Sequence, residues 1–287
     1  MRILVLMEDL PARGENSGGK CRPEECCLVN EHGLSFYVET AQRKLLVDTG
    51  ASGLTWDNAK ALGVDLAAID TVILSHGHYD HTGGAMSFAA CNETAAIYLN
   101  ELAGGEYYNL RDGEKYIGID KAILAFPQTR LLRGDTVTEL GDGVCVFGGV
   151  TGRRLWPEGN RILKRKTADG FEQDCFDHEQ YVVVREDGRS VLIGGCAHNG
   201  VLNILDRYRE IFGAYPDAFV SGFHMMKREP YTEAEIATIR ETAEELSRLP
   251  IRCYTGHCTG MPAYEIMKPI LGDRLTYFSV GEEITVR

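Results

Sequence analysis

Short apolar runs rich in β-branched and aromatic residues recur along the chain, and polar residues or glycines separate them. This pattern is typical of buried β-strands. It predicts a first set of strands at Ile3–Leu6, Leu34–Val38, Lys44–Val47, Thr71–Leu74 and Ala96–Leu99. It predicts a second set at Val144–Phe147, Tyr181–Val184, Val191–Ile193, Ala218–Val220, Arg252–Tyr254 and Arg274–Phe278.

Apolar positions at helical spacing occur between these runs. Thr55–Leu62 is one such segment, and Thr232–Leu246 is a longer one in which Thr232 and Glu235 are placed to form a capping box. Two further helices are expected at Asn199–Tyr208 and Met261–Leu271. Because strands and helices mix in each half without a regular βαβ rhythm, the pattern favours an α+β architecture over a doubly wound parallel sheet.

Length and composition describe an ordinary globular chain. Its 287 residues are 44% hydrophobic and 25% charged, and this length by itself leaves the number of domains open. The excess of 42 acidic over 30 basic residues gives a net charge of −12, which argues against a nucleic-acid partner. No apolar run approaches the roughly 20 residues needed to cross a bilayer, so no membrane partner is expected.

The N-terminus and the cysteines bear on location. The start MRILVLMEDL has too short an apolar stretch for a signal peptide, so we expect a cytoplasmic protein. Nine cysteines, an odd number, are best explained as reduced thiols in that compartment. Cys21, Cys26 and Cys27 cluster after a polar loop at Gly14–Lys20, and the sequence assigns them no role.

A basic segment interrupts this acidic chain. Arg153–Lys166 holds six basic residues and a single acid, Glu158, which predicts a basic loop. Two interpretations stay open. The loop is a solvated surface turn, or it guides an anionic small-molecule substrate, with Arg153 and Arg154 binding the anionic group.

The segment 75–84, SHGHYDHTGG, carries the most informative chemistry. It follows a predicted buried strand and places four good metal ligands, His76, His78, Asp80 and His81, within six residues. Residues two apart on an extended backbone point the same way, so His76 and His78 can hold one ion. The turn into the glycines can bring the other two toward a second ion. Two metal ions about 3.5–4 Å apart can activate a shared water as a nucleophile.

The spacing His-X-His-X-Asp-His resembles the metallo-β-lactamase superfamily. Further motifs are similar to the branch that includes dihydropterin ribofuranosyl-aminobenzene phosphate synthase-like proteins: Glu31–Ser35, Leu46–Gly50, Gly195–Gly200, Ser221–His224 and Thr255–Gly260. The resemblance implies a four-layer αββα sandwich with metals at one edge between the sheets. It also implies a single catalytic domain over residues 1–287.

The resemblance assigns ligands residue by residue. His76 and His78 match the first-metal ligands, Asp80 and His81 match the second-metal ligands, and His257 matches the last histidine of the pattern. For the third histidine of the first metal, His198 is preferred and His178 is the alternative. The implied cofactor is one or two divalent ions, with zinc expected and manganese or iron as alternatives.

Other positions are less directly assigned. Most two-metal members carry a bridging Asp where this chain has Cys196, which is either a thiolate ligand or a small buried residue. Asp48 is expected to orient a metal-binding histidine. His224 either faces the substrate as a proton donor or has a structural role, and His32 is expected to stabilise a turn.

The leading interpretation is a hydrolase in which a metal-activated hydroxide attacks an ester or phosphoester of an anionic small molecule. Asp80 would orient the nucleophile or receive its proton. The alternatives are a synthase or transferase that condenses two substrates, and a non-catalytic metal-binding sensor. Iron redox chemistry is disfavoured because a flavodoxin-like segment is lacking, and the sequence predicts no particular oligomeric state.

Overall fold

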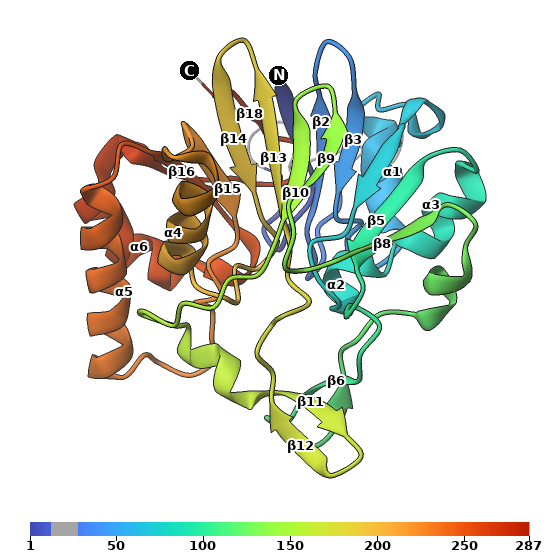
Figure 1. Ribbon diagram of the computed structural model, residues 1–287. Helices are drawn as coiled ribbons and strands as arrows, with labels where there is room; N and C mark the ends of the chain where they lie inside the picture. The colour runs from blue at the N-terminus through green and yellow to red at the C-terminus, as the bar shows by residue number, and fades with distance from the viewer. Residues whose placement is uncertain (13–27, 287) are drawn as a thin grey trace.

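Two seven-stranded β-sheets stack face to face in the computed structural model, with helices on their outer sides (Figure 1). The structure describes residues 1–12 and 28–286. The Gly14–Lys20 loop and the cysteines at 21, 26 and 27 lie outside these described residues. Both described ends of the chain lie at the end of the sandwich opposite the small sheet formed by β6, β11 and β12 (Figure 1).

The first sheet has the strand order β18-β1-β2-β3-β4-β5-β8. Antiparallel pairs join β18, β1, β2 and β3, and parallel pairs join β3, β4, β5 and β8. The strands are β1 (Arg2–Met7), β2 (Ser35–Glu39), β3 (Lys44–Val47), β4 (Thr71–Ile73), β5 (Ala96–Asn100), β8 (Thr129–Leu132) and β18 (Glu283–Ile284).

The second sheet repeats this arrangement in the order β17-β16-β15-β14-β13-β10-β9. Strands β14 to β17 are parallel, and β9, β10, β13 and β14 pair antiparallel. The strands are β9 (Thr138–Gly141), β10 (Val144–Phe147), β13 (Tyr181–Glu186), β14 (Arg189–Ile193), β15 (Ala218–Ser221), β16 (Arg252–Thr255) and β17 (Leu275–Tyr277). Every strand predicted from the sequence is present within a few residues.

Both sheets are buried on both faces, which explains the continuous apolar runs. In β1, Ile3 and Val5 join the core between the sheets, whereas Leu4 and Leu6 join the core under the helices. Successive side chains of a strand point to opposite faces, so one run supplies two cores. The predicted α+β class and αββα layering are confirmed.

The helices form the two outer layers. The first sheet is covered by α1 (Leu54–Ala61) and α3 (Ala85–Cys91), and the second by α4 (Val201–Phe212), α5 (Glu233–Ser247) and α6 (Met261–Leu271). Short helical turns lie in the connections: α2 (Tyr79–Thr82), η2 (Leu66–Ala68), η3 (Lys121–Ala125), η4 (Glu158–Ile162), η5 (His257–Thr259) and η6 (Gly272–Arg274). No helix within the described ranges 1–12 and 28–286 is long and apolar enough to cross a membrane.

A third, four-stranded sheet was not predicted. Its order is β12-β11-β6-β7, formed by β6 (Tyr107–Asn109), β7 (Lys115–Tyr116), β11 (Leu163–Thr167) and β12 (Gly170–Gln173). The expectation of a basic loop is therefore wrong for the end of Arg153–Lys166, which is a strand. The apolar pattern missed it because Lys164 and Arg165 bond across the ladder to Gln173 and Glu172, so polar side chains occupy both faces.

Helix α5 begins with the capping box that the sequence predicted. The Thr232 hydroxyl accepts a hydrogen bond from the Glu235 amide, and the Glu235 carboxylate accepts one from the Thr232 amide. Thr232→Ala should lower the free energy of unfolding by about 1 kcal/mol, because it leaves helical amides without partners. Urea denaturation measures this, and Thr232→Ser is the matched control that keeps the oxygen. An equal loss in both variants would contradict the capping explanation.

Candidate metal centre

The parallel strands direct their carboxyl ends to one edge of the sandwich, and the candidate ligands follow these strands. His76, His78 and the α2 turn follow β4, and Cys196 with His198 follows β14. His224 follows β15 and His257 follows β16. Since the ends of neighbouring parallel strands meet at one edge, ligands far apart in sequence become neighbours.

Two glycines allow this close packing. A Cβ atom on Gly77 would lie 2.3 Å from the Ala103 carbonyl oxygen, so the residue between the first two histidines must be glycine. A Cβ on Gly195 would lie 2.2 Å from the Ser75 hydroxyl. Both distances are far shorter than real contacts. A larger side chain at Gly77 would push the segments after β4 and β5 apart, and one at Gly195 would push the ends of β4 and β14 apart.

The first ligand cluster consists of His76, His78 and His198, whose ligand nitrogens lie within 4.8 Å of one another. All three imidazoles are buried, and their Nε2 atoms have no hydrogen-bond partner within the described part of the chain. Leaving a buried polar atom without a partner costs about 1–3 kcal/mol. Three such nitrogens converging on one point therefore fit a bound metal ion.

Hydrogen bonds to neighbouring side chains hold the His76 and His198 rings in orientations that leave Nε2 free. His76 donates from Nδ1 to the Ser75 hydroxyl at 2.9 Å, and that hydroxyl donates to Asp48. His198 donates from Nδ1 to the Asn160 side-chain oxygen at 3.0 Å, while the Asn160 amide donates to the His198 carbonyl. Such partners set the tautomer and the ring orientation of metal-binding histidines.

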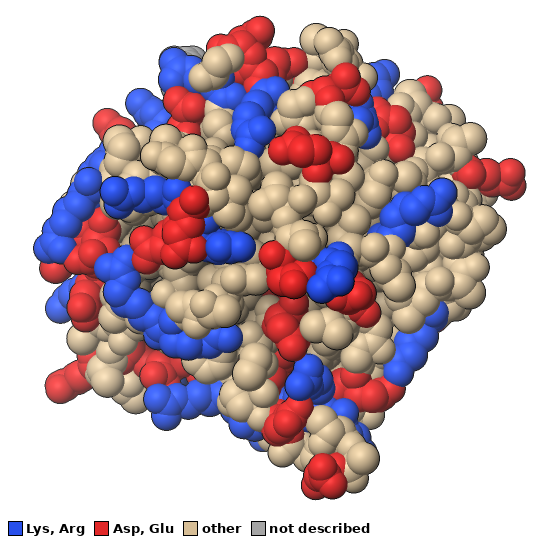
Figure 2. Space-filling view, in the orientation of Figure 1, with Lys and Arg blue, Asp and Glu red and all other residues tan. Residues whose placement is uncertain are grey.

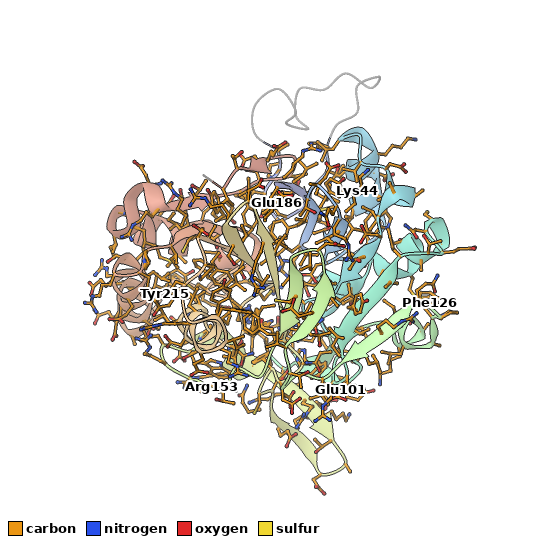
Figure 3. The ribbon with its side chains drawn as sticks, turned by 45° about the horizontal axis from the view of Figure 1, so that its top comes forward. Lys44, Glu101, Phe126, Arg153, Glu186 and Tyr215 are labelled. Carbon is orange, nitrogen blue, oxygen red and sulfur yellow. The ribbon has the colours of Figure 1, made fainter. Side chains whose placement is uncertain are left out.

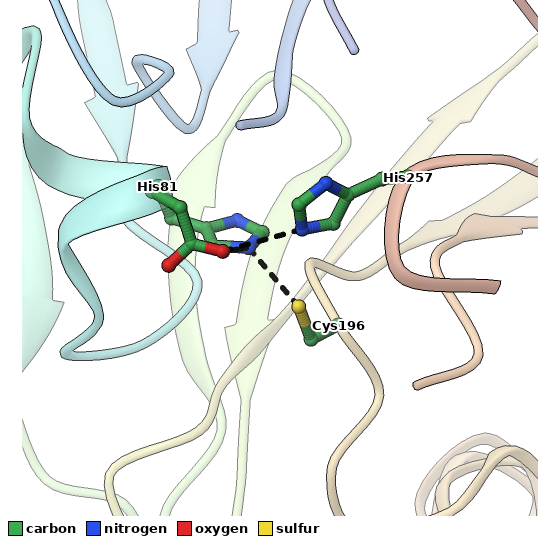
Figure 4. Close-up of side chains that lie close together, drawn as sticks. His81, Cys196 and His257 are labelled. Carbon is green, nitrogen blue, oxygen red and sulfur yellow. Dashed lines mark hydrogen bonds and ion pairs between the residues drawn. The ribbon is translucent and has the colours of Figure 1, made fainter. Parts of the chain in front are cut away.

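The second cluster consists of Asp80, His81, Cys196 and His257, again with ligand atoms within 4.8 Å of one another. Figure 4 shows His81, Cys196 and His257 pointing toward one another. The His81 Nε2 lies 3.1 Å from the Cys196 sulfur. One Asp80 oxygen lies 3.3 Å from the His257 Nε2 and 3.5 Å from the His81 Nε2. This mixed carboxylate, imidazole and thiol set suits zinc or another transition metal.

Carboxylates hold both histidines of the second cluster. His81 donates from Nδ1 to Asp48 at 2.6 Å, and Asp48 also accepts the Ser75 amide. His257 donates from Nδ1 to Asp9 at 2.6 Å. Asp48 therefore lies next to His81, where an orienting carboxylate was expected. Asp9 has the corresponding position next to His257.

Cys196 lies between the two clusters. It belongs to the group with Asp80, His81 and His257, and it also forms a group with His198 and His224. This is the position where the family resemblance implies a bridging carboxylate. The Cys196 sulfur therefore lies within 4.8 Å of ligand atoms from both clusters.

His76, His78, His198 and Asp80 carry the protonation states that metals require, whereas the neighbouring acidic groups raise the pKa of His257 and burial raises the pKa of the Cys196 thiol. Burial lowers the pKa of His76 and His198 well below the usual range and that of His78 to about 3, so these imidazoles are neutral. Burial opposes ionisation of Asp80, but His81 and His257 outweigh it and lower the pKa of this carboxyl. Neutral imidazole and ionised carboxylate are the ligand forms.

His178, the alternative first-metal ligand, has both ring nitrogens engaged. Its Nδ1 accepts a hydrogen bond from the Gly77 amide at 3.0 Å, and its Nε2 donates to Asp174 at 3.2 Å. Neither nitrogen is available to an ion in this arrangement. His178 groups with His78 and Asp174, whereas His198 groups with both His76 and His78 and has a free Nε2 in the described part of the chain.

Backbone strain collects at the same edge. Asp48, Ala197, His224 and His257 all have positive φ angles, between 49° and 62°. This region is unfavourable for residues other than glycine, and such strain persists mainly at functional sites.

A cavity of about 340 Å³ opens over the two clusters. His78, Asp80, Cys196, His198 and His224 line its inner end. Its outer wall comes from the third sheet and the 226–228 turn, with Asn109, Arg111, Lys115, Met226, Lys227 and Arg228 among the lining residues. Ligand sites typically combine such an enclosed space with a few polar groups.

Two cations in this wall have no carboxylate partner among the residues that the structure describes. Lys227 bonds to Glu235 and Arg228 to Asp112, whereas Arg111 and Lys115 form no ion pair in the described chain. The Lys115 ammonium lies 5.2 Å from the Tyr79 ring centre. An otherwise acidic protein therefore presents positive charge at the mouth of this cavity.

Arg153 and Arg154, expected to bind substrate, line neither this cavity nor the adjoining one. Arg154 pairs with Glu245 and Asp206 on the surface, where acidic and basic side chains intermix (Figure 2). Arg153 lies at the end of the sandwich that also holds Glu101 (Figure 3). It donates to backbone carbonyls and to Asn199. These bonds occupy both guanidinium groups, so the expectation does not fit their positions.

His224 and His32 both line the cavity. The His224 ring lies 4.1 Å from the His198 ring, centre to centre, and its buried Nδ1 has no hydrogen-bond partner in the described residues. His32 was expected to stabilise a turn. Its Nδ1 lies 2.8 Å from Asp9, and its ring stacks on His257 with centres 5.0 Å apart.

Several site residues were missed from the sequence. Asp9 and Glu8 follow β1, where Glu8 accepts the His257 amide, and Asn160 lies in the segment interpreted as a basic loop. Arg111 and Lys115 lie in the β6–β7 hairpin. For Glu8 and Asp9 the sequence offered one signal, a pair of carboxylates directly after an apolar strand. For Asn160, Arg111 and Lys115 the local sequence offers no such signal.

Comparisons with known proteins agree with this architecture. The family model described as the metallo-β-lactamase superfamily matches residues 29–152. A solved structure, Tm1679, described as a metal-dependent hydrolase of the β-lactamase superfamily, is 30% identical, with a TM-score of 0.79 and coverage of 100% of this chain and 99% of that one. The chain therefore belongs to the metallo-β-lactamase superfamily.

Two further relatives are informative. The 7,8-dihydropterin-6-methyl-4-(β-D-ribofuranosyl)-aminobenzene-5′-phosphate synthase of Methanocaldococcus jannaschii is 28% identical over 82% of this chain and 83% of its own length. Zn²⁺-bound PqqB from Methylobacterium extorquens is 15% identical, with a TM-score of 0.57 over 99% of this chain and all of that one, which shows a shared fold.

Proposed function

We propose that this protein is a metal-dependent hydrolase that cleaves an ester or phosphoester of an anionic small molecule. The observation that carries the proposal is the position of the two ligand clusters, directly beneath a cavity whose lining cations Arg111 and Lys115 have no carboxylate partner among the described residues. The cations match an anionic group, and the clusters match a hydrolytic metal centre.

His76, His78 and His198 would hold one ion, and Asp80, His81, Cys196 and His257 would hold a second. Divalent ions at these positions would acidify a bound water to near-neutral pKa and stabilise developing negative charge. Zinc is the metal that this ligand set suits best.

The chain's own groups supply orientation and proton transfer. The Asp80 carboxylate reaches the cavity and is ionised, so it can accept a hydrogen bond or a proton from the attacking water. His224 lines the cavity beside His198. In this proposal it donates a proton to the leaving-group oxygen. Arg111 and Lys115 would bind the anionic group with charge-assisted hydrogen bonds.

A synthase that condenses two substrates is the second candidate. The similarity to the methanogen synthase favours it, as do two adjoining cavities of similar volume, about 340 and 320 Å³. A reaction that requires two organic substrates would distinguish this activity from hydrolysis.

The test is metal content by mass spectrometry combined with turnover of phosphodiester, phosphomonoester and carboxylic-ester substrates. The hydrolase proposal expects bound divalent metal and turnover that a chelator abolishes. Full metal occupancy without turnover of any of these esters would contradict it and favour the synthase or a metal-binding sensor.

Substrate capture should depend on the two unpaired cations. Arg111→Gln with Lys115→Gln should raise KM for an anionic ester about tenfold or more and change kcat little, since each charge-assisted bond is worth about 1.5–3 kcal/mol. Steady-state kinetics at low salt measures this. Arg154→Gln is the matched control, because that guanidinium pairs with surface carboxylates. An equal rise in KM for a neutral ester would rule out an electrostatic role.

A further inference from the structure

A second cavity of about 320 Å³ adjoins the one over the ligand clusters. Its walls come from the segment 155–162, the turn 224–231 and the face of α5 that carries Thr238 and Ile239. The two cavities share six lining residues: Arg111, Gly159, Ile162, His224, Met226 and Lys227. The second cavity therefore continues the first, and His224 stands at the junction.

The surface of this second cavity is largely apolar. Residues that line it but not the first include Leu155, Pro157, Met225, Tyr231 and Ile239. Met226 at the junction is 40% exposed, although it is a large apolar side chain. Apolar surface left open beside a reaction centre is typical of a ligand-binding groove.

Several polar groups of this wall already have partners within the protein, including Glu158, which pairs with Arg161; Glu229 forms no ion pair with the described residues. Both oxygens of Glu235 accept from Lys227, at 2.8 and 2.9 Å. The Tyr231 hydroxyl donates to the Met225 carbonyl, and the Thr238 hydroxyl donates to the Ala234 carbonyl. Burying these groups under a ligand would leave few bonds unmade, so the wall favours an apolar occupant.

From this continuity and chemistry we infer that the second cavity binds an apolar substituent of the same molecule whose anionic group lies at Arg111 and Lys115. This inference rests on the proposed function and narrows its substrate class. The substrate carries an anionic group at Arg111 and Lys115, in the cavity over the ligand clusters, and an alkyl or aryl group that passes His224 into the second cavity. Burial of that group supplies affinity roughly in proportion to its apolar area.

The experiment uses phosphonates, which keep the anionic head but contain no ester bond. Methyl-, butyl- and phenylphosphonate are titrated calorimetrically into the metal-loaded protein, into Thr238→Trp, which fills the second cavity, and into Ala237→Trp. Ala237 is an exposed neighbour on the same helix that does not line either cavity, so it is the matched control. Circular dichroism verifies that all three proteins are folded.

Butyl- or phenylphosphonate should bind the unmodified protein at least about tenfold more tightly than methylphosphonate. Thr238→Trp should remove this gain and keep the methylphosphonate affinity, whereas Ala237→Trp should preserve the gain. A gain with only one of the two apolar probes supports the inference and tells an alkyl from an aryl substituent. Equal affinities for all three probes, or a gain that survives in Thr238→Trp, would overturn it.

These titrations, together with the ester-turnover assay of the proposed function, separate this inference from the hydrolase activity. Cavity-dependent affinity without hydrolysis of any ester would leave the inference standing and remove the hydrolase activity. Ester hydrolysis without any preference for apolar substituents would support the hydrolase activity and overturn the inference about the second cavity.

Discussion

Replacing His198 by alanine is expected to remove the metal ion of the first cluster and to lower turnover by more than about 100-fold. Loss of a partner that only orients a ligand typically costs about 10–100-fold, and loss of the ligand itself should exceed that. The fold should persist, because removing a buried imidazole whose Nε2 has no partner also removes an unsatisfied polar atom. Mass spectrometry measures the loss of metal, and circular dichroism measures whether the fold persists.

His178→Asn is the matched control for this experiment. An asparagine oxygen can accept the Gly77 amide as the His178 Nδ1 does, so the loop between the first two histidines stays supported. This variant should retain its metal, since both His178 ring nitrogens are engaged elsewhere. If His178→Asn lost metal and His198→Ala kept it, the assignment of the third histidine would be reversed.

Asp48→Asn should weaken the second metal site by about 10–100-fold and leave the first site largely occupied. The buried Asp48 carboxylate accepts from His81 Nδ1 and from both the amide and the hydroxyl of Ser75. An amide side chain at Asp48 accepts fewer of these bonds and removes the charge that polarises His81. Asparagine tolerates the positive φ of 62° at this position, so the substitution tests charge rather than backbone strain.

Titration with Zn²⁺ in competition with a chromophoric chelator measures the affinities of the two sites. Asp174→Asn changes another buried carboxylate that pairs with a histidine, 3.2 Å from His178, and it should leave both affinities within about twofold, inside the usual scatter of additive effects. Equal weakening by the two variants would mean that Asp48 acts through general stability and not through His81.

Local sequence predicted the sheets well because their strands are buried on both faces. Runs such as Val144–Phe147 have no solvent-facing positions, and apolar content alone identifies them. The third sheet was not predicted because β7 and β12 are short and largely exposed, and their stability comes from pairing with β6 and β11. Cross-strand pairing joins distant residues, and no local pattern reports it.

The sequence also predicted the ligand motif, since His76, His78, Asp80 and His81 lie within one turn of chain. It preferred His198 to His178 as the third histidine only through the family resemblance. That choice depends on hydrogen bonds from Gly77, Asn160 and Asp174, which come from three separate segments. The position of Arg154 depends on distant residues in the same way: it belongs to a basic segment of the sequence, but it pairs with Asp206 and Glu245 and does not line either cavity.

By itself, then, the sequence determined the buried strands of the two large sheets, the capped helix α5 and the ligand motif, because each depends on residues close together in the chain. The tertiary structure decided which ring nitrogens are free, which cations lack a partner and where the cavity extends. These properties are set by side chains from different strands meeting at one edge of the sandwich, such as Asp9 with His257 and Asp48 with His81. Because these side chains are buried, leaving a polar atom without a partner costs free energy. Each such atom therefore needs a partner within the protein or a bound ion.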